Sequence, residues 1–347
     1  MRAAVFDAYD GPLNVINIDE PDCPEDGVII DVRACGVCRS DWHAWKGADS
    51  DVLPPHVSGH EFAGVVLEVG KSITRFKVGQ RVTAPFILAC GACPDCMGGE
   101  PTTCNSQHVI GFSAYGAFAE RIAIPHADFN LVHLPDSMDF VDAAGMGCRV
   151  TTAFRALIDR AQLAPGEWLA VHGCGGVGLS AIKIASAIGA QTVAVDVSDD
   201  ALELAHALGA TYIINARNVD NVGEAIRDIT GGGAHVSADA VGTTIAFHNS
   251  LGSLRKLGRH VQIGMPTEEH AEPSIKLLEH IYSRQLTILG TRGMAANRFT
   301  ALFNMIKAGH LSLDGLVTKR ISLEGAGDAL RAMDTSAVAG VTVIDSF

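Results

Sequence analysis

The apolar residues of the first 148 positions occur in short bursts separated by turn residues. Val28–Val32, Ala63–Val69 and Arg81–Ala84 are such bursts, and Gly, Pro and Asp are frequent between them. Short apolar runs bounded by turn formers are typical of β-strands. The pattern therefore predicts a strand-rich, barrel-like domain with long loops in this part of the chain.

From about residue 150 the pattern changes to short apolar runs that alternate with stretches of helical length. The expected strands are Trp168–His172, Thr192–Val195, Tyr212–Ile214, Ala238–Val241, His260–Ile263 and Leu286–Leu289. Amphipathic stretches between them, such as Val177–Ile188 and Asp200–Leu208, are expected helices. This alternation specifies an α/β domain whose parallel sheet is covered by helices on both faces.

The alternation stops after about residue 292, and the remaining chain is expected to return to the first domain. We therefore predict a split first domain of residues 1–149 and 292–347, and a second domain of residues 150–291. A length of 347 residues agrees with two domains, because single hydrophobic cores stop growing below this size.

Charge and hydropathy limit the partners of the chain. It carries 39 acidic and 26 basic side chains, a net charge of −13, which argues against nucleic acid or an anionic membrane as a partner. No apolar run approaches the roughly 18 residues of a membrane span. The first residues, MRAAVFDAYDG, lack the apolar region of a signal peptide, so a cytoplasmic protein is expected.

Four of the nine cysteines lie close together, at Cys90, Cys93, Cys96 and Cys104, with the spacing C-x2-C-x2-C-x7-C. Thiolates at this spacing, with Gly and Pro between them to allow tight turns, can surround one zinc ion as a closed structural site. Two disulfides or ordinary buried cysteines are the alternatives. Disulfides require an oxidising compartment, which nothing in the sequence indicates.

A second, more dispersed set consists of Cys38, His60 and Cys148. Two thiolates and one imidazole make three metal ligands and leave the fourth position open, which is the arrangement of a catalytic zinc site. Taken one at a time, each residue could equally be an ordinary core residue. Their occurrence beside a four-cysteine segment favours the metal interpretation.

A dinucleotide-binding loop is indicated by Gly173-Cys-Gly-Gly-Val-Gly178, which fits G-x-G-x-x-G. The loop follows an expected strand and begins an expected helix, as this motif requires. Asp196 lies 18 residues after Gly178, where a carboxylate can accept hydrogen bonds from ribose hydroxyls and repel a 2′-phosphate. No Arg or Lys occurs within Val197–Leu202, so we expect NAD rather than NADP. A glycine-rich turn that binds nothing is the alternative.

With these motifs in place, the chain resembles the zinc-dependent alcohol dehydrogenases of the medium-chain dehydrogenase/reductase family over its full length. The resemblance rests on Gly36–His43, Gly59–Glu61, Cys90–Cys104, Gly147–Thr152, Gly173–Gly178 and Asp196. It implies a GroES-like β-rich catalytic domain, a Rossmann cofactor domain, and a homodimer or homotetramer. It also implies one catalytic and one structural zinc ion, with reversible hydride transfer between an alcohol and NAD that yields an aldehyde or ketone.

The resemblance also assigns roles around the metal. Cys38, His60 and Cys148 would bind the catalytic zinc, Glu61 would be a carboxylate that can transiently reach the metal, and Asp41 would orient His60. We further expect a proton relay from the alcohol to Ser40, through the nicotinamide ribose, to His43 and solvent, because histidine titrates near neutral pH.

Further residues are expected at the cofactor and the substrate. Arg39 would bind the pyrophosphate, while the basic residue that relatives often carry after a C-terminal glycine is replaced here by Val341. The residues expected to contact the cofactor are Arg39, Thr152, Gly173, Gly175, Gly176, Val177, Gly178, Asp196, Val241, Ile263 and Met265. Trp42, Trp45 and Phe86 are candidates for an apolar substrate pocket, and packing in the core is the alternative for each.

Other functions remain open. Within the zinc enzymes, a threonine or polyol dehydrogenase is possible, although polyol enzymes tend to carry a carboxylate where this chain has Cys148. A catalytically silent, nucleotide-binding redox sensor would be expected to lack ligands or relay residues. A zinc-independent quinone or enoyl reductase would lack the Cys38, His60 and Cys148 set.

Overall fold

The computed structural model describes residues 1–334 and 339–347, and it divides into two compact units. Unit 1 comprises Met1–Thr151, Gly293–Asn304 and Val317–Phe347, and unit 2 comprises Thr152–Arg292 and Met305–Leu316. This division differs from the expected boundaries chiefly at residues 305–316, which belong to unit 2, and by one or two residues at 150–151 and 292. The Lys183 ammonium of unit 2 donates to the Asp314 carbonyl at 2.8 Å and ties this segment there.

Unit 1 is built from short strands, as expected. Its strands are β1 (Arg2–Phe6), β2 (Leu13–Asn17), β3 (Val28–Val37), β4 (His56–Val57), β5 (Glu61–Val69), β6 (Arg81–Thr83), β7 (Ile87–Leu88), β8 (His108–Val109), β9 (Arg121–Ile124), β10 (Val132–His133), β17 (Val317–Ser322) and β18 (Val341–Ser346). Its helices are α1 (Arg39–Trp45), α2 (Pro94–Met97), α3 (Ala127–Asn130), α4 (Phe140–Met146) and α11 (Ala326–Arg331).

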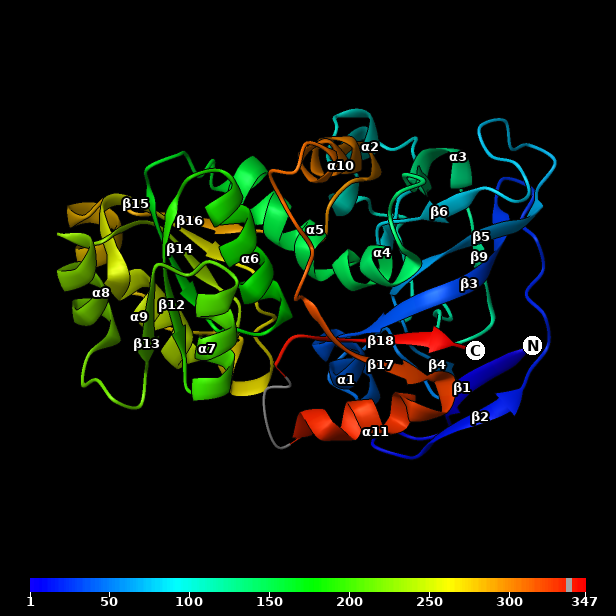
Figure 1. Ribbon diagram of the computed structural model, residues 1–347, viewed down its shortest axis with the longest axis horizontal. Coiled ribbons are helices and arrows are strands. Elements are labelled where there is room, and N and C mark those ends of the chain that lie inside the picture. Colours follow the sequence, from blue (N-terminus) through cyan, green and yellow to red (C-terminus); the bar gives the residue numbers. More distant parts are fainter. Residues whose placement is uncertain (335–338) are drawn as a thin grey trace. The chain divides into compact units, whose positions relative to one another are not determined.

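The main sheet of unit 1 places the C-terminal strand next to the strand that leads to the metal set. Its order is β10-β6-β5-β3-β18-β17, and β9 also pairs with β3 (Figure 1). Strand β18 pairs antiparallel with β3, with Thr342 opposite Val37 and Ile344 opposite Cys35. The tail therefore completes this sheet. Phe62 of β5 and Ile30 of β3 are fully buried in the core beside this sheet, together with Phe118 from the loop before β9.

Unit 2 contains a six-stranded sheet whose neighbouring strands are all parallel. Its strands are β11 (Trp168–His172), β12 (Gln191–Asp196), β13 (Tyr212–Asn215), β14 (Ala234–Asp239), β15 (Leu254–Gln262) and β16 (Thr287–Gly290), and its helices are α6 (Gly176–Ala187), α7 (Asp199–Ala207), α8 (Val222–Thr230) and α9 (Thr244–Ser253). Helices α5 (Arg149–Phe154) and α10 (Phe299–Lys307) cross the boundaries between the units in the sequence. The order β13-β12-β11-β14-β15-β16 is that of a Rossmann domain. The predicted fold class is confirmed.

Two expected strands end differently from the prediction. Strand β14 begins at Ala234 and stops at Asp239, so Val241 lies in the following loop. The reason is local, because the Asp239 carboxylate accepts hydrogen bonds from the backbone N–H groups of Val241 at 2.8 Å and Gly242 at 2.9 Å. Strand β15 likewise ends at Gln262, and Ile263 follows it.

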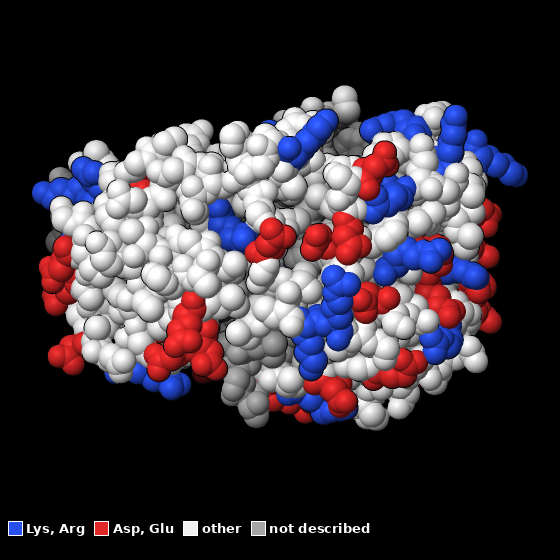
Figure 2. Space-filling view, viewed as in Figure 1, with Lys and Arg blue, Asp and Glu red and all other residues white. Residues whose placement is uncertain are grey.

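Charged side chains are mixed on the face of the molecule that Figure 2 shows. Basic groups lie next to acidic ones, and a wide part of this face carries neither. Among the exposed ion pairs of the described residues, Lys46 pairs with Asp10 at 2.6 Å and with Asp334 at 3.1 Å. In the described part of the chain, no helix is long and apolar enough to cross a membrane.

Candidate active site

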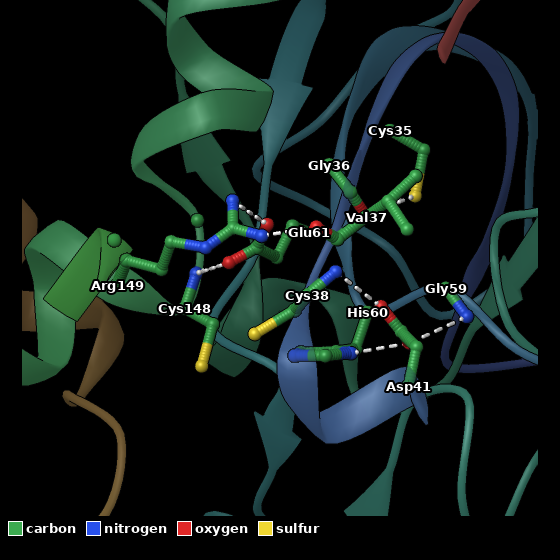
Figure 3. Close-up of polar contacts among 12 residues, drawn as sticks. Cys35, Gly36, Val37, Cys38, Asp41, Gly59, His60, Glu61, Cys148 and Arg149 are labelled. Carbon is green, nitrogen blue, oxygen red and sulfur yellow. Dashed lines mark hydrogen bonds and ion pairs between the residues drawn. The ribbon is translucent and has the colours of Figure 1, made fainter. Parts of the chain in front are cut away.

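Cys38, Asp41 and His60 are held together at the end of strand β3. Cys38 precedes helix α1, and its backbone N–H donates to Asp41 at 2.8 Å. The other Asp41 oxygen accepts from the Gly59 N–H at 3.0 Å and from Nδ1 of His60 at 2.8 Å (Figure 3). Asp41 is fully buried. Two backbone N–H groups hold its carboxylate, and one hydrogen bond to that carboxylate's Oδ1 orients the His60 ring. This agrees with the orienting role expected for Asp41.

Cys148 and Glu61 approach the same point from other elements. Cys148 follows helix α4, and Glu61 opens strand β5. The Cys148 backbone N–H donates to Glu61 Oε1 at 3.1 Å, and Nη1 of Arg149 donates to Glu61 Oε2 at 2.7 Å. Figure 3 shows the sulfur atoms of Cys38 and Cys148 on the same side as the His60 ring.

The four side chains Cys38, His60, Glu61 and Cys148 fit a metal ion. One ligand atom from each lies within 4.8 Å of the others. His60 Nε2 is buried and has no hydrogen-bond partner among the described residues, although its other nitrogen is bound to Asp41. A buried polar atom is normally satisfied, and this one faces two thiols. A zinc ion bound by two thiolates and this nitrogen would satisfy it and leave one position for Glu61, water or substrate.

The charges of the cluster are strongly coupled. The hydrogen bond from Cys148 and the Arg149 guanidinium hold the pKa of the Cys38 thiol well below its usual range, despite burial. Burial alone would lower the pKa of His60, but the Asp41 carboxylate and Cys38 raise it above its ordinary value. Burial, opposed by Arg149, raises the pKa of Glu61 to about 8. The Cys38 thiol is thus shifted toward the thiolate form, which is the form that binds a metal ion.

The four sulfur atoms of Cys90, Cys93, Cys96 and Cys104 form a separate cluster around helix α2. The Cys93–Cys96 sulfur distance is 3.4 Å, Cys90–Cys104 is 3.6 Å, Cys93–Cys104 is 3.8 Å and Cys90–Cys96 is 4.0 Å. A tetrahedral zinc ion with Zn–S bonds near 2.3 Å requires sulfur atoms about 3.8 Å apart. All nine cysteines are free thiols. The structure therefore fits the metal interpretation and not the disulfide alternative.

The glycine loop lies between β11 and α6 with the backbone shape that the motif requires. Gly173 has a positive φ of +95°, and a β-carbon on Gly178 would lie 1.8 Å from the Gly173 carbonyl oxygen. A β-carbon on Gly175, in contrast, would meet nothing within 4 Å. The Gly175 backbone at the start of α6 is thus open to a phosphate, and the helix N-terminus favours negative charge there.

Asp196 lies at the carboxyl end of β12, beside this loop. Its carboxylate accepts from Cys174 N–H at 2.6 Å, Val197 N–H at 2.7 Å and Ser198 N–H at 3.0 Å. These bonds hold it next to the glycine loop, as expected for a residue that binds ribose. They use three of its roughly four acceptor positions.

Asp239 was not among the residues found from the sequence. Besides Val241 and Gly242, its carboxylate accepts from the Gln262 amide at 3.1 Å, which itself donates to the Gly264 carbonyl at 2.9 Å. Asp239 thereby ties together the two loops that carry the expected cofactor contacts Val241, Ile263 and Met265. Val241 and Met265 are 47% and 41% exposed.

The relay candidates and Arg39 lie on helix α1. Ser40 and His43 are half-buried, and burial together with the Arg39 charge lowers the pKa of His43. The Arg39 guanidinium lies 4.2 Å from the Trp42 ring centre and donates to the Met333 carbonyl. Arg39 is therefore engaged within unit 1. Thr152, another expected cofactor contact, is buried, with a hydroxyl that has no partner among the described residues.

The three candidate pocket aromatics differ in position. Phe86 packs edge-on against the His60 ring, with centroids 5.6 Å apart, and so does Phe112 at 5.3 Å, which was not found from the sequence. Trp42 donates from its indole nitrogen to Asp334 at 2.7 Å. Trp45 is 2% exposed and its indole nitrogen donates to the Gly11 carbonyl at 2.7 Å. Trp45 thus packs in the core, which is the alternative given for it above, and Phe86 and Trp42 stay predictions for the pocket.

Comparison with known proteins identifies two family domains and several similar dehydrogenases. Residues 24–136 match the alcohol dehydrogenase GroES-like domain, and residues 176–308 match the zinc-binding dehydrogenase domain. An alcohol dehydrogenase of Geobacillus stearothermophilus is 37% identical over 296 residues, which cover 84% of this chain and 86% of that protein. An L-threonine 3-dehydrogenase of Caldanaerobacter subterraneus subsp. tengcongensis is 32% identical, covering 84% and 83%.

The fold comparison covers the whole chain. The alcohol dehydrogenase TADH from Thermus sp. ATN1 superposes with a TM-score of 0.91 at 30% identity, covering 100% of both chains. Together with the two domain matches and the 37% identical relative, this places the protein among oxidoreductases with GroES-like and Rossmann domains. The chain belongs to the zinc-dependent alcohol dehydrogenases of the medium-chain dehydrogenase/reductase family.

Proposed function

We propose that the protein catalyses reversible hydride transfer between NAD and a primary or secondary alcohol with an apolar or aromatic substituent, giving an aldehyde or ketone. The observation that carries the proposal is the cluster of Cys38, His60 and Cys148, in which the buried His60 Nε2 has no partner. The open backbone at Gly175 supports a dinucleotide as the hydride acceptor.

The proposed roles follow from what each side chain can do. When bound, zinc would supply a Lewis acid that polarises the oxygen of the alcohol or carbonyl group. Cys38, His60 and Cys148 would hold it, and Asp41 would keep the His60 ring in place. The four-cysteine cluster would hold the second, structural zinc ion.

Ser40 and His43 would carry away the proton that the alcohol loses. The Ser40 hydroxyl can accept that proton while passing on its own, and His43 can take the proton and release it to solvent. The lowered pKa of His43 keeps its imidazole neutral, and therefore able to accept a proton, to lower pH than an exposed histidine.

NAD is proposed rather than NADP because of Asp196. Its negative charge lies at the end of β12 beside the glycine loop, where the 2′-phosphate of NADP would be repelled. Arg39 is the proposed pyrophosphate contact. One of its guanidinium nitrogens donates to the Met333 carbonyl, and the remaining N–H groups could donate to the phosphate.

Apolar substrates are proposed because Phe86 and Phe112 pack against the His60 ring. Aromatic side chains at this distance from the ligand set provide apolar surface and no hydrogen bonds for a polar substrate. Threonine oxidation is the second candidate, favoured by the 32% identical L-threonine 3-dehydrogenase. It would require polar groups to bind the amino acid.

We also propose a homo-oligomer. Leu277, Leu278 and Tyr282 lie in the short π-helix Leu277–Ser283 that precedes β16, and they are 65%, 74% and 78% exposed. Strand β16 is an edge strand of the six-stranded sheet. Apolar groups beside an open sheet edge are suited to contact with a second copy of the chain.

The first test is NADH formation by the zinc-loaded protein with primary, secondary, aromatic and polyol alcohols and with threonine, with NADP in parallel. Turnover of apolar alcohols that is faster with NAD would support the proposal. Turnover of threonine or polyols alone would favour the second class of substrate. No turnover of any of them would contradict alcohol oxidation by this chain.

A further inference from the structure

Glu61 lies in a slot that fits its carboxylate closely. A β-carbon on Gly36 would lie 2.1 Å from Glu61 Oε2, and one on Gly147 would lie 2.8 Å from Glu61 Cβ. Both contacts are shorter than real β-carbons tolerate, so a larger residue at either position would displace the carboxylate. The two glycines come from β3 and from the end of α4, and the slot therefore depends on residues 111 positions apart in sequence.

Arg149 closes this slot. One guanidinium nitrogen donates to Glu61 Oε2 at 2.7 Å, and another donates to the Val37 carbonyl at the end of β3 (Figure 3). The Cys148 N–H occupies the other carboxylate oxygen. Arg149 is 5% exposed and Glu61 is fully buried. The guanidinium is anchored at two points, so it holds the carboxylate in one orientation.

The Glu61 carboxylate also lies close to a second position, the proposed metal site. A Glu61 oxygen lies within 4.8 Å of the ligand atoms of Cys38, His60 and Cys148. Carboxylate oxygens are good zinc ligands at about 2.0–2.2 Å, so a small movement would let Glu61 fill the fourth position. A buried carboxylate without a cation is strongly unfavourable. If the guanidinium were removed, a metal ion held by Cys38, His60 and Cys148 would be a cation within reach of Glu61.

We propose that Arg149 is a positioning residue that holds Glu61 away from the metal and thereby keeps the fourth coordination position open. The inference rests on the proposed metal site and deepens it. Without Arg149, Glu61 joins Cys38, His60 and Cys148 as a permanent fourth ligand. The catalytic site then becomes closed, like the four-cysteine site.

The test measures access to the fourth position without relying on turnover. Cobalt(II) replaces zinc, and imidazole is titrated as an added ligand while the visible absorption spectrum is recorded. The closed four-cysteine site contributes a constant spectrum, because imidazole has no open position to enter there. The proteins are the unchanged chain, Arg149→Met, Arg149→Lys, and the double variant Arg149→Met with Glu61→Gln.

We expect the unchanged protein to bind imidazole with a clear spectral shift. Arg149→Met should raise the imidazole dissociation constant about tenfold or more, because Glu61 competes for the same position. In the double variant the imidazole dissociation constant should return to within about threefold of the value for the unchanged protein. The uncharged amide of the Glu61→Gln change competes poorly with imidazole for the fourth position. Arg149→Lys, which keeps the charge but loses the two-point anchor, should show a smaller increase. If Arg149→Met does not fold, the imidazole titration of Arg149→Lys provides the test.

A matched control is Arg259→Met, which removes another arginine paired with a glutamate, Glu167 at 2.5 Å, in unit 2. It should leave the imidazole titration unchanged. Equal imidazole affinity in the unchanged protein and both Arg149 variants would overturn the inference, as would failure of the double variant to recover. If the unchanged protein showed no imidazole-sensitive cobalt spectrum, the proposed metal site itself would be contradicted. That result differs from failure of the Arg149 proposal, in which the spectrum responds to imidazole but the Arg149 variants bind it equally well.

Discussion

Asp41 shows how much of the site depends on one side chain. Its two oxygens accept from the backbone before helix α1, from the backbone before β5 and from the His60 ring. A single buried carboxylate thus fixes both the ring tautomer and the distance between two ligand-bearing segments. The position of His60 is set before any metal binds.

At the same scale, replacement of His43 by alanine tests the proton relay. The lowered pKa of His43 means that the unchanged enzyme should keep its rate until the pH falls below the ordinary histidine value, because only the neutral ring accepts the proton. His43→Ala should lower kcat by about 10²-fold near neutral pH, with a smaller loss at high pH where solvent base substitutes. The measurement is the pH dependence of kcat, with His108→Ala on strand β8 as the control. An unchanged rate at both low and high pH would contradict the relay.

Asp196 provides a second test at the level of one residue. Asp196→Asn removes the negative charge while keeping an oxygen to accept from the loop N–H groups. The ratio of kcat/KM for NADP to that for NAD should rise about 10- to 100-fold, because the negative charge of Asp196 would no longer repel the 2′-phosphate of NADP. Asp199→Asn is a matched control, because it makes the same change of charge three residues away. An unchanged ratio in Asp196→Asn would show that this carboxylate does not select the cofactor.

Some of these residues could be found from the sequence and others could not. The cysteines and His60 can be found because only a few residue types bind zinc through sulfur or nitrogen, and because the cysteines have a spacing typical of zinc ligands. Arg149 and Asp239 are not, since their roles depend on partners that only the fold brings near. Arg149 contacts Glu61 and Val37, which lie 88 and 112 positions earlier in the chain. An arginine or aspartate of this kind has no local pattern.

At the scale of elements, the alternation of apolar and polar runs predicts which strands exist but not where they end. Strand β11 has the expected bounds, because four apolar residues and the buried His172 lead directly to the glycine loop. Strand β14 begins four residues earlier than expected, since polar His235 and Ser237 alternate with apolar neighbours inside it. Its end is determined by the side chain of Asp239, which hydrogen-bonds to the loop that follows.

A buried polar network joins the strands of this sheet to helix α9. Ser250 on α9 contacts Ser237 on β14 at 2.9 Å and His260 on β15 at 2.9 Å, and Ser253 lies 3.5 Å from Nε2 of His172 on β11. Burial and the neighbouring His260 lower the pKa of His172 to about 3. The folded sheet therefore holds His172 in its neutral form.

This network makes the stability of unit 2 depend on pH. Between pH 6.5 and about 3 the unfolded chain binds a proton at His172 that the folded chain does not bind. The free energy of unfolding should therefore fall as the pH falls, by up to about 1.4 kcal/mol per pH unit from this residue. His172→Gln should reduce that slope between pH 6.5 and 4.5 in urea unfolding. His206→Gln, on the exposed face of α7, should leave the slope unchanged, and an equal slope in both variants would contradict the assignment.

For the whole molecule, the sequence predicts two domains and a returning tail. It does not predict that residues 305–316 belong to unit 2, because that assignment depends on contacts such as Lys183 with Asp314 rather than on a pattern. The oligomeric state is also a property of the whole molecule, and it is not determined by any motif in the chain.

The proposed association can be tested through the exposed apolar side chains of the π-helix Leu277–Ser283 before β16. Tyr282→Glu combined with Leu278→Glu places two negative charges on this surface, which should weaken contact between copies and lower the sedimentation coefficient at micromolar concentration. Leu53→Glu is the control, because Leu53 is 72% exposed in unit 1 and lies outside this π-helix. If the double variant sedimented like the unchanged protein, self-association through this surface would be excluded.

The position of β18 in its sheet has a consequence for synthesis on the ribosome. This strand pairs with β3 on one side and β17 on the other, yet it is translated after every residue of unit 2. Unit 2 can therefore complete its folding while the sheet of unit 1 still lacks the inner strand β18. Until β18 emerges, the β3 edge beside Cys35 and Val37 has no partner there, and an exposed strand edge is a site where nascent chains aggregate. Assistance from a chaperone would therefore matter most at the end of translation.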